Sequence, residues 1–371
     1  MSIQINHFSK EQTTILKGLA ILLIVLHNFF HNLTPVIGEN EFQFSAETFW
    51  NFYHTLRASP ENVLRAIFSY FGHYGVQIFI FFSSYGLTRK YYQKPLIIRQ
   101  FLANRVNKIY LSFLLCVAVY IVLGLVKEHF MPGEKVLYWD SLLWKVLLVS
   151  NFIPGQALMP VGPWWFMPFI FQVYALYPWL LSRYQKHGYK FLILVALTAI
   201  LVESQINAYL ITQHLNINYT VFGYLPLLCL GLFFAAQDRI KLTVLHVALA
   251  LSLSLFILGN FNQYAWIFSN IALITVVLTG SPALFRFLLR HAYTTQFFTF
   301  FGNISFHLFM VNGFLRTPFH YVAEFYHCWW IDDLAAVTSL LFSSLCAYCL
   351  SKLDAYIRAV VAQKHAISQK R

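Results

Sequence analysis

Hydrophobic residues recur in long runs from one end of the chain to the other, and few polar residues interrupt them. A helix needs roughly 20 apolar residues to cross the ~30 Å hydrocarbon core of a bilayer. By that measure the pattern predicts ten spans, near residues 14–33, 66–88, 109–126, 164–182, 190–207, 220–236, 242–259, 264–279, 297–315 and 334–351. No long polar stretch separates them, so residues 1–371 are expected to form a single all-α, polytopic transmembrane helix bundle.

One further apolar stretch does not fit a span. Residues 141–155 are apolar but short, and they include Lys145. Such a segment is more typical of an interfacial or re-entrant element than of a membrane-crossing helix.

Composition supports the membrane assignment. The chain is 58% hydrophobic and 11% charged, values that a soluble domain of 371 residues has too little interior to hide. The net charge of +12 does not indicate nucleic acid, because the basic residues lie in short segments between the apolar runs. Segment 89–108 is the most basic of them and has no acidic residue. By the positive-inside rule, the charge pattern predicts that both termini are cytoplasmic.

The five cysteines indicate neither a disulfide framework nor a metal site, because they are scattered. Cys346 and Cys349 form a C-x-x-C, but on an apolar helix they are expected to be small packing residues. No metal is therefore expected from the sequence.

The first span carries ionisable residues, which are costly in a bilayer and are candidates for function. His27 and His31 share one helix face, and Lys17 lies ~15 Å nearer the cytoplasmic end. Lys17 is suited to reach the interface, and the histidines to bond neighbouring helices. His27 is equally suited to take a proton from a hydroxyl that attacks an acyl group, or to relay protons in a transporter. Periodicity leaves these alternatives open.

For other polar or aromatic residues the sequence also allows two interpretations. Glu203 is placed to orient an acceptor hydroxyl or simply to reach water, and the second reading is preferred. Trp164 and Trp165 are expected in an interfacial aromatic belt, although tryptophans also serve as platforms for sugars.

Several stretches together resemble the membrane acyltransferase-3 family. The first is "LKGLAILLIVLHN" in the first span, where a basic residue and a histidine bracket the helix. It is followed in order by "GHYGVQIFIFFSSYGL", "RVNKIY", "GPWWFMPFIFQVYALYP", and "LPLLCLGLFFA" with "FGNISFHLFMVNGFLR". The resemblance covers nearly the whole chain.

The resemblance implies a ten-span bacterial enzyme of the inner (plasma) membrane. Such an enzyme transfers an acyl group, usually acetyl, from cytoplasmic acyl-CoA to a hydroxyl of a cell-envelope glycan or lipid-linked sugar. By position, the resemblance places the acyl-CoA phosphates near Lys17, Arg89, Arg105 and Lys108, because basic side chains bind phosphates. It places His27 and Asn28 at the reacting centre. Residues expected to support the acceptor are His31, His73, Trp164, Trp165 and Glu203.

This sequence departs from the family pattern at three positions. The basic residue and the histidine usually have ten residues between them, whereas Lys17 and His27 have nine, and Asn28 takes the usual histidine position. Lys108 replaces the second arginine of a paired basic motif, and Ser84 stands where glycine is common. A transporter or flippase for a polar or lipid-linked substrate, and an inactive family member with a scaffolding role, remain the alternatives.

Overall fold

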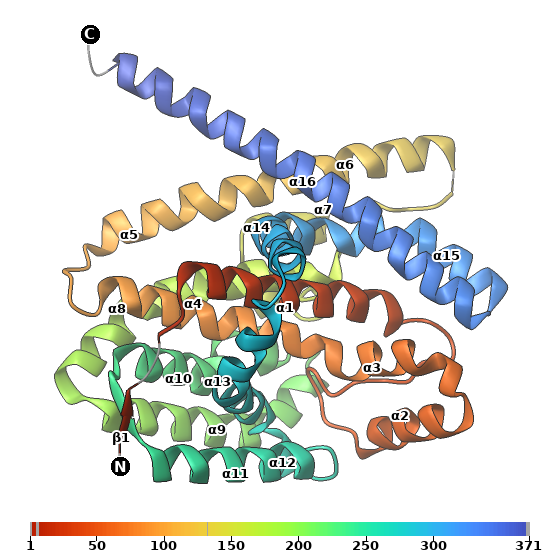
Figure 1. The fold of residues 1–371 in the computed structure, drawn as a ribbon. Coiled ribbons are helices and arrows are strands. Elements are labelled where there is room, and N and C mark those ends of the chain that lie inside the picture. Colours follow the sequence, from red (N-terminus) through yellow and green to blue (C-terminus); the bar gives the residue numbers. More distant parts are fainter. Residues whose placement is uncertain (1, 5–6, 132, 369–371) are drawn as a thin grey trace.

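The computed structural model describes residues 2–4, 7–131 and 133–368, and nearly all of them are helical (Figure 1). The first half contains α1 (Lys10–Phe30), α2 (Ala46–Ala58), α3 (Val63–Phe71), α4 (Gly75–Tyr91), α5 (Ile98–Arg105), α6 (Leu111–Phe130), α7 (Trp139–Val146) and α8 (Phe166–His187). The second half contains α9 (Tyr189–Thr212), α10 (Leu225–Ala236), α11 (Leu242–Leu258), α12 (Gln263–Trp266), α13 (Ser269–Leu288), α14 (Ala292–Leu315), α15 (Thr317–Tyr326) and α16 (Trp329–Ser368). The predicted all-α class is confirmed.

A short antiparallel ribbon is the one departure from helix in regular structure within the described residues. Strand β1 (Ser2–Gln4) pairs with β2 (Arg239–Lys241), with Ile3 opposite Ile240. The ribbon joins the beginning of the chain to the connection between α10 and α11.

Each of the ten predicted spans overlaps one helix or two consecutive helices. Seven helical segments in the described part of the chain are long and apolar enough to cross a membrane, namely Lys10–Phe30, Pro60–Tyr91, Ile98–Phe130, Tyr189–Thr212, Ser269–Leu288, Ala292–Leu315 and Trp329–Val361. Helices Val221–Ala236 and Leu242–Leu258 are apolar but shorter. The count of ten therefore stays a prediction. Helix α7 has eight residues, about 12 Å of helix, which is too short to cross the bilayer.

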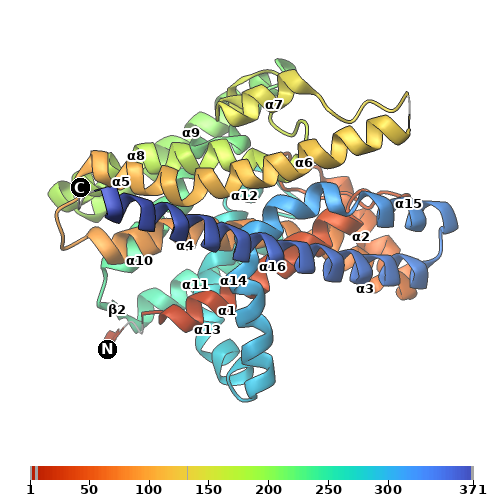
Figure 2. The same cartoon turned by 90° about the horizontal axis from the view of Figure 1, so that it is seen from above.

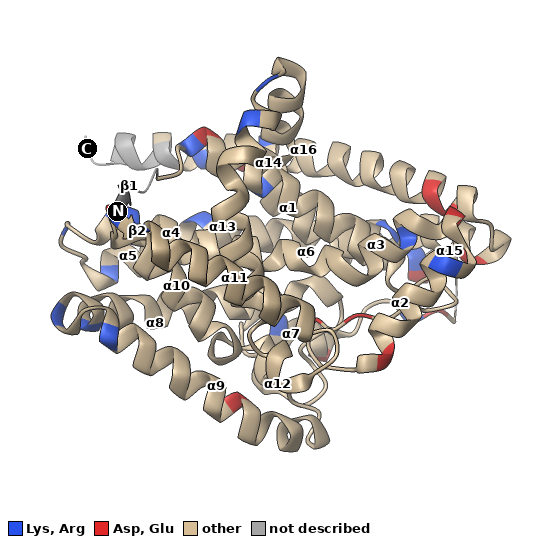
Figure 3. Cartoon of the chain, turned by 60° about the horizontal axis from the view of Figure 1, so that its bottom comes forward, with Lys and Arg blue, Asp and Glu red and all other residues tan. Residues whose placement is uncertain are grey.

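Charge is separated between the two ends of the bundle. Helix α1 begins and α16 ends at the same side of the molecule, at the left of Figure 1. Lys and Arg residues gather at that end, whereas Asp and Glu residues are more frequent at the opposite end, near α2 and α15 (Figure 3). This arrangement agrees with an even number of spans. We call the basic end the inner side, following the predicted orientation, and the opposite end the outer side.

Helix α1 lies at the centre of the bundle. It begins with a capping box, in which Ser9 accepts a hydrogen bond from the Gln12 amide and Gln12 accepts one from the Ser9 amide. Its apolar residues pack against α14, α4 and α3. Helix α16 runs along one face of the molecule, where it contacts α14 and α6 (Figures 1 and 2).

Two glycines allow α1 and α14 to approach closely. A Cβ atom at Gly18 would collide with the Phe298 carbonyl oxygen, and one at Gly302 would collide with the Thr14 carbonyl oxygen. Small residues at such positions are typical of closely packed transmembrane helices. Asn28 of α1 also bonds Asn312 of α14 farther along both helices, so the two helices run in the same direction.

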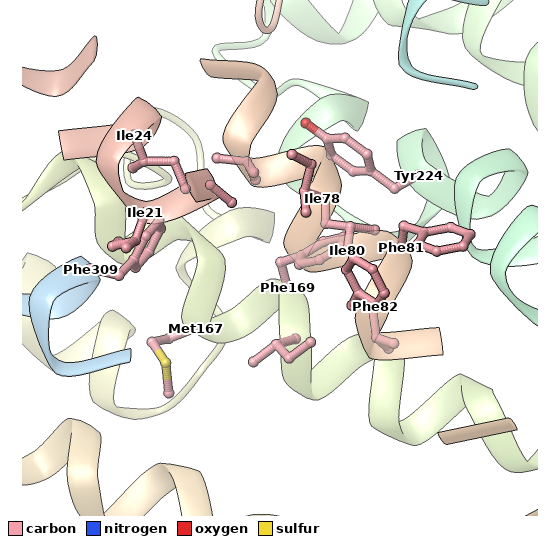
Figure 4. Packing of buried hydrophobic residues seen from close by; sticks show 14 of the residues in the cluster. Ile21, Ile24, Ile78, Ile80, Phe81, Phe82, Met167, Phe169, Tyr224 and Phe309 are labelled. Carbon is pink, nitrogen blue, oxygen red and sulfur yellow. The ribbon is translucent and has the colours of Figure 1, made fainter. Parts of the chain in front are cut away.

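The buried core joins these helices to α4 and α8. Ile21 and Ile24 of α1, Ile80 of α4, Phe169 of α8 and Phe309 of α14 contribute to one cluster (Figure 4). The core fixes the positions of the helix faces that carry polar residues.

Gly302→Val is expected to destabilise the protein by about 1–3 kcal/mol, because its side chain would push α1 away from α14. Thermal unfolding in detergent measures the effect. Gly280→Val is the matched control, since no atom lies within 4 Å of a Cβ at Gly280. Equal losses in the two variants would contradict the close contact.

Candidate active site

His27 lies in the outer half of α1 and is buried, with 3% of its surface exposed. Its Nδ1 atom is 3.1 Å from the Phe68 carbonyl oxygen and 3.2 Å from that of Ser69. Both carbonyls belong to the last turn of α3, and that of Phe68 also accepts the hydrogen bond of the capping Gly72 amide. A carbonyl oxygen only accepts, so Nδ1 is the donor and the ring presents Nε2 to the site.

Two glutamates from the connection after α1 face this Nε2 atom. Glu39 Oε2 lies 3.0 Å from it, and Glu41 Oε2 lies 3.8 Å from it. Burial, reinforced by the adjacent Glu39 carboxylate, raises the pKa of Glu41 to about 8. Burial alone would raise the pKa of Glu39 as well, but the neighbouring His27 ring outweighs it and lowers that pKa. The Glu39 carboxylate therefore carries the negative charge beside His27.

The next polar residues of α1 are fixed by other contacts. The His31 ring stacks on His27 at a centroid distance of 4.6 Å, and its Nδ1 atom is 2.9 Å from the His27 carbonyl oxygen. Asn28 donates a hydrogen bond of 2.9 Å from Nδ2 to Oδ1 of Asn312 on α14. Asn28, at the usual histidine position, thus ties α1 to α14.

These residues line a cavity of about 230 Å³, which we call the outer cavity. Its polar lining residues are His27, Asn28, His31, Asn32, Glu39, Glu41 and Arg316. Trp165 and Phe42 form part of its apolar wall. The cavity has the size and polarity to hold a small polar group beside His27.

A second cavity, of about 690 Å³, lies on the inner side, and we call it the inner cavity. Its basic lining residues are Lys17, Lys90, Arg105, Lys108 and Arg358, and its other walls are largely apolar. Val76 and Phe309 line both cavities, so the two spaces meet at these side chains. The basic inner cavity and the histidine-containing outer cavity thus adjoin at Val76 and Phe309.

The paired basic residues, Arg105 and Lys108, lie at a local irregularity in the helix. A π-helical stretch, Val106–Tyr110, joins α5 to α6 and includes Lys108. The Arg105 guanidinium lies 5.3 Å from the Phe101 ring centroid and 5.5 Å from that of Tyr174. Single π turns often occur at functional sites. Here the turn lies beside the two basic side chains that line the inner cavity.

A polar cluster in the inner cavity was missed by the sequence analysis. Asp354 of α16 accepts a hydrogen bond of 3.0 Å from Arg358 Nε and one of 2.9 Å from Ser112 Oγ. His307 Nε2 of α14 lies 3.7 Å from Asp354 Oδ2. His307 is an ionisable residue inside the predicted span 297–315, a signal that was available. Glu39 was missed because acidic residues in a connection are usually solvated.

Four predicted site residues lie outside both cavities. His73 is buried behind His27, at a ring-centroid distance of 5.7 Å. Arg89 donates to the Ala235 carbonyl oxygen at the end of α10, and Lys90 lines the inner cavity instead. Glu203 is 7% exposed, so the expectation that it reaches water is wrong. The fourth residue outside both cavities is Trp164.

The aromatic-belt interpretation is also wrong. Trp164 is fully buried and donates from Nε1 to the Met310 carbonyl oxygen at 2.8 Å. Trp165 is 3% exposed and stacks with Tyr224 at a centroid distance of 6.0 Å. The two rings face the protein interior because a 3-10 turn, Gly162–Trp165, points them inward before α8 begins. Only Trp165 lines the outer cavity.

The fold and site define a helical protein, with the apolar helices of an integral membrane protein, a basic cavity, and an adjoining cavity lined by a buried histidine. Comparison with known families narrows this class. Residues 13–351 match the family model described as an acyltransferase domain, so the chain belongs to the membrane acyltransferase-3 family. It is therefore an acyltransferase of the membrane. No curated protein and no solved structure matches the chain significantly.

Proposed function

We propose that this protein transfers an acyl group, in the simplest case acetyl, from cytoplasmic acyl-CoA to a hydroxyl of an envelope glycan or lipid-linked sugar. The observation that supports the proposal is the meeting of the basic inner cavity with the outer cavity of His27 at Val76 and Phe309. A donor and an acceptor from opposite sides would meet there. The proposal places the protein in the bacterial inner (plasma) membrane, with both termini cytoplasmic.

The inner cavity is suited to coenzyme A. Lys17, Arg105 and Lys108 offer positive charge to its phosphates, and the apolar walls suit its pantetheine arm. Arg105 is held between aromatic rings, so its donors are already oriented. In this arrangement the thioester points along the cavity toward Val76.

The outer cavity is suited to the acceptor hydroxyl. The hydroxyl loses its proton to His27 as its oxygen attacks the thioester carbon. The C–S bond then breaks, the acyl group remains on the acceptor oxygen, and coenzyme A leaves as the thiolate, which takes up a proton. Glu39 stabilises the charge that forms on the His27 ring. The second N–H of the Asn28 side-chain amide would donate a hydrogen bond to the developing oxyanion.

The alternatives receive less support. Family membership favours acyl transfer over a transporter or flippase. An inactive member is disfavoured because His27, one position before the usual histidine, lines the outer cavity and is held by Phe68 and Glu39. The shift by one residue is therefore compatible with a working site.

Arg105→Ala is expected to weaken acetyl-CoA binding at least tenfold, because a charge-assisted hydrogen bond contributes about 1.5–3 kcal/mol. Isothermal titration of the purified protein measures the affinity. Arg99→Ala removes the same charge from the same basic segment at an exposed position and is the control. Equal weakening by both variants would argue against the inner cavity as the donor site.

Val76→Trp is expected to separate binding from transfer, since the larger side chain fills the junction of the two cavities. Acetyl-CoA binding should stay within a few-fold of wild type while transfer to the acceptor is lost. Val247→Trp on the exposed face of α11 is the matched control. Full transfer activity in Val76→Trp would show that the acyl group takes another route.

His27→Ala is expected to lower the transfer rate at least 100-fold, because general base catalysis contributes about 10²–10⁴-fold. Glu39→Gln should lower kcat about 10–100-fold with little change in KM for acetyl-CoA, and Glu39→Asp should restore part of the loss. Glu41→Gln should have a smaller effect, since Glu41 lies farther from Nε2.

Transfer by the purified variants, followed by mass spectrometry of the acceptor, measures these rates. His246→Ala, an exposed histidine of α11, is the control and should retain activity. A wild-type rate in His27→Ala would remove His27 from the mechanism. Equal losses in Glu39→Gln and Glu41→Gln would contradict a specific role for Glu39.

A further inference from the structure

The outer cavity brings together side chains that are common ligands of transition metals. One nitrogen each of His27 and His31 and one carboxylate oxygen of Glu39 all lie within 4.8 Å of one another. Two histidines one helical turn apart on one face, completed by a carboxylate from another segment, form the ligand set of many catalytic zinc sites.

The hydrogen bonds behind the histidines support this interpretation. Nδ1 of His27 donates to the carbonyls of Phe68 and Ser69, and Nδ1 of His31 lies 2.9 Å from the His27 carbonyl oxygen. Histidines that bind metals usually donate their other ring N–H to a carbonyl or a carboxylate, which fixes the ring and its tautomer. In each ring Nδ1 faces a carbonyl, so Nε2 is the nitrogen that would bind a metal, and on His27 the proton that Nε2 shares with Glu39 must leave as the metal binds.

The distances are close to those of a bound ion. Zn²⁺ binds histidine nitrogen and carboxylate oxygen at about 2.0–2.2 Å, which separates tetrahedral ligands by about 3.4 Å. His27 Nε2 and Glu39 Oε2 are already 3.0 Å apart. No two of the three ligand atoms are more than 4.8 Å apart, so small rotations of His31 and Glu39 would bring them to the tetrahedral separation. Glu41 Oε2, 3.8 Å from His27 Nε2, is available as a fourth ligand.

Charge and space also favour a dication. The Glu39 and Glu41 carboxyl groups lie close together beside the histidines, so that Glu41 keeps its proton, and a divalent ion would favour the charged form of both. The ligands line a cavity of about 230 Å³, so there is room for an ion and an exchangeable water or hydroxyl. The mixed nitrogen and oxygen set favours Zn²⁺ over Mg²⁺ or Ca²⁺, which prefer oxygen ligands alone.

We propose that His27, His31 and Glu39 form a binding site for Zn²⁺ in the outer cavity, with Glu41 completing the coordination. This proposal departs from the expectation of no metal, which was based on the cysteines. A nitrogen bound to zinc accepts no proton, so a bound ion excludes His27 from acting as the base. Zinc is therefore an inhibitor of acyl transfer from the outer side. That consequence rests on the proposed function, whereas the binding itself does not.

The test is direct binding of Zn²⁺ alone to the full-length protein, purified in detergent and treated with a chelator. Isothermal titration is expected to give one ion per chain, and Co²⁺ in its place is expected to give the visible bands of a low-symmetry site. Glu39→Gln and His31→Gln remove ligands, so each should weaken binding by no less than the about 10–100-fold that loss of an outer-shell partner costs. Thermal unfolding of the metal-free variants checks that they remain folded.

Two matched controls identify the site. His129→Gln removes an exposed histidine at the end of α6, and Cys346→Ser with Cys349→Ser removes the C-x-x-C pair, and both should bind Zn²⁺ as wild type does. The proposal is overturned if the protein binds no Zn²⁺, or if Glu39→Gln and His31→Gln bind it like the controls. Because binding needs no acyl donor, loss of the proposed transferase function would leave this result unaffected.

The inhibitory role is tested separately. Stoichiometric Zn²⁺ should abolish transfer by the wild-type protein, and a chelator should restore it. Transfer at the full rate by protein shown to contain one Zn²⁺ would overturn the inhibitory role while leaving the binding site intact.

Discussion

The close contact between α1 and α14 is the constraint on which the two-cavity arrangement depends. Gly18 and Gly302 allow the two backbones to touch at the inner side, and Asn28 bonds Asn312 farther out. Because the helices run in parallel, Phe309 is held at the level of His27, where it lines both cavities. Without this contact, Phe309 would not lie where the two cavities adjoin.

The polar side chains inside the bundle form hydrogen bonds with backbone carbonyls as well as with one another. The end of α3 supplies carbonyls to His27, and the amide of Asn312 donates to the carbonyls of Leu308 and Phe309 on its own helix. In a bilayer an unpaired polar group costs several kcal/mol, so these partners are needed for stability. They also fix the direction in which His27 presents its reactive nitrogen. Stability and chemistry thus depend on the same hydrogen bonds.

The two cavities differ in charge in a way that matches different ligands. Basic residues dominate the inner cavity, where Asp354 is paired with Arg358 and accepts a hydrogen bond from Ser112. The outer cavity combines two histidines with two glutamates and a single arginine. A phosphate-bearing donor is suited to the first cavity, whereas a neutral hydroxyl or a cation is suited to the second. This difference supports entry of the two substrates from opposite sides, and it also makes the outer cavity receptive to zinc.

The sequence by itself determined the helical class, the family, and those site residues whose signal is local. Lys17 and His27 stood out as charged or titratable groups in an apolar helix, and Arg105 and Lys108 as a basic pair beside a span. Only the tertiary structure decided that Glu39 folds back onto His27, that Arg89 turns away to α10, and that Trp164 and Trp165 face inward. The physical reason is that hydrophobic periodicity records which face of a segment is buried. It does not record which distant segment covers that face, and the chemistry of this site arises where α1, α3 and the connection after α1 meet.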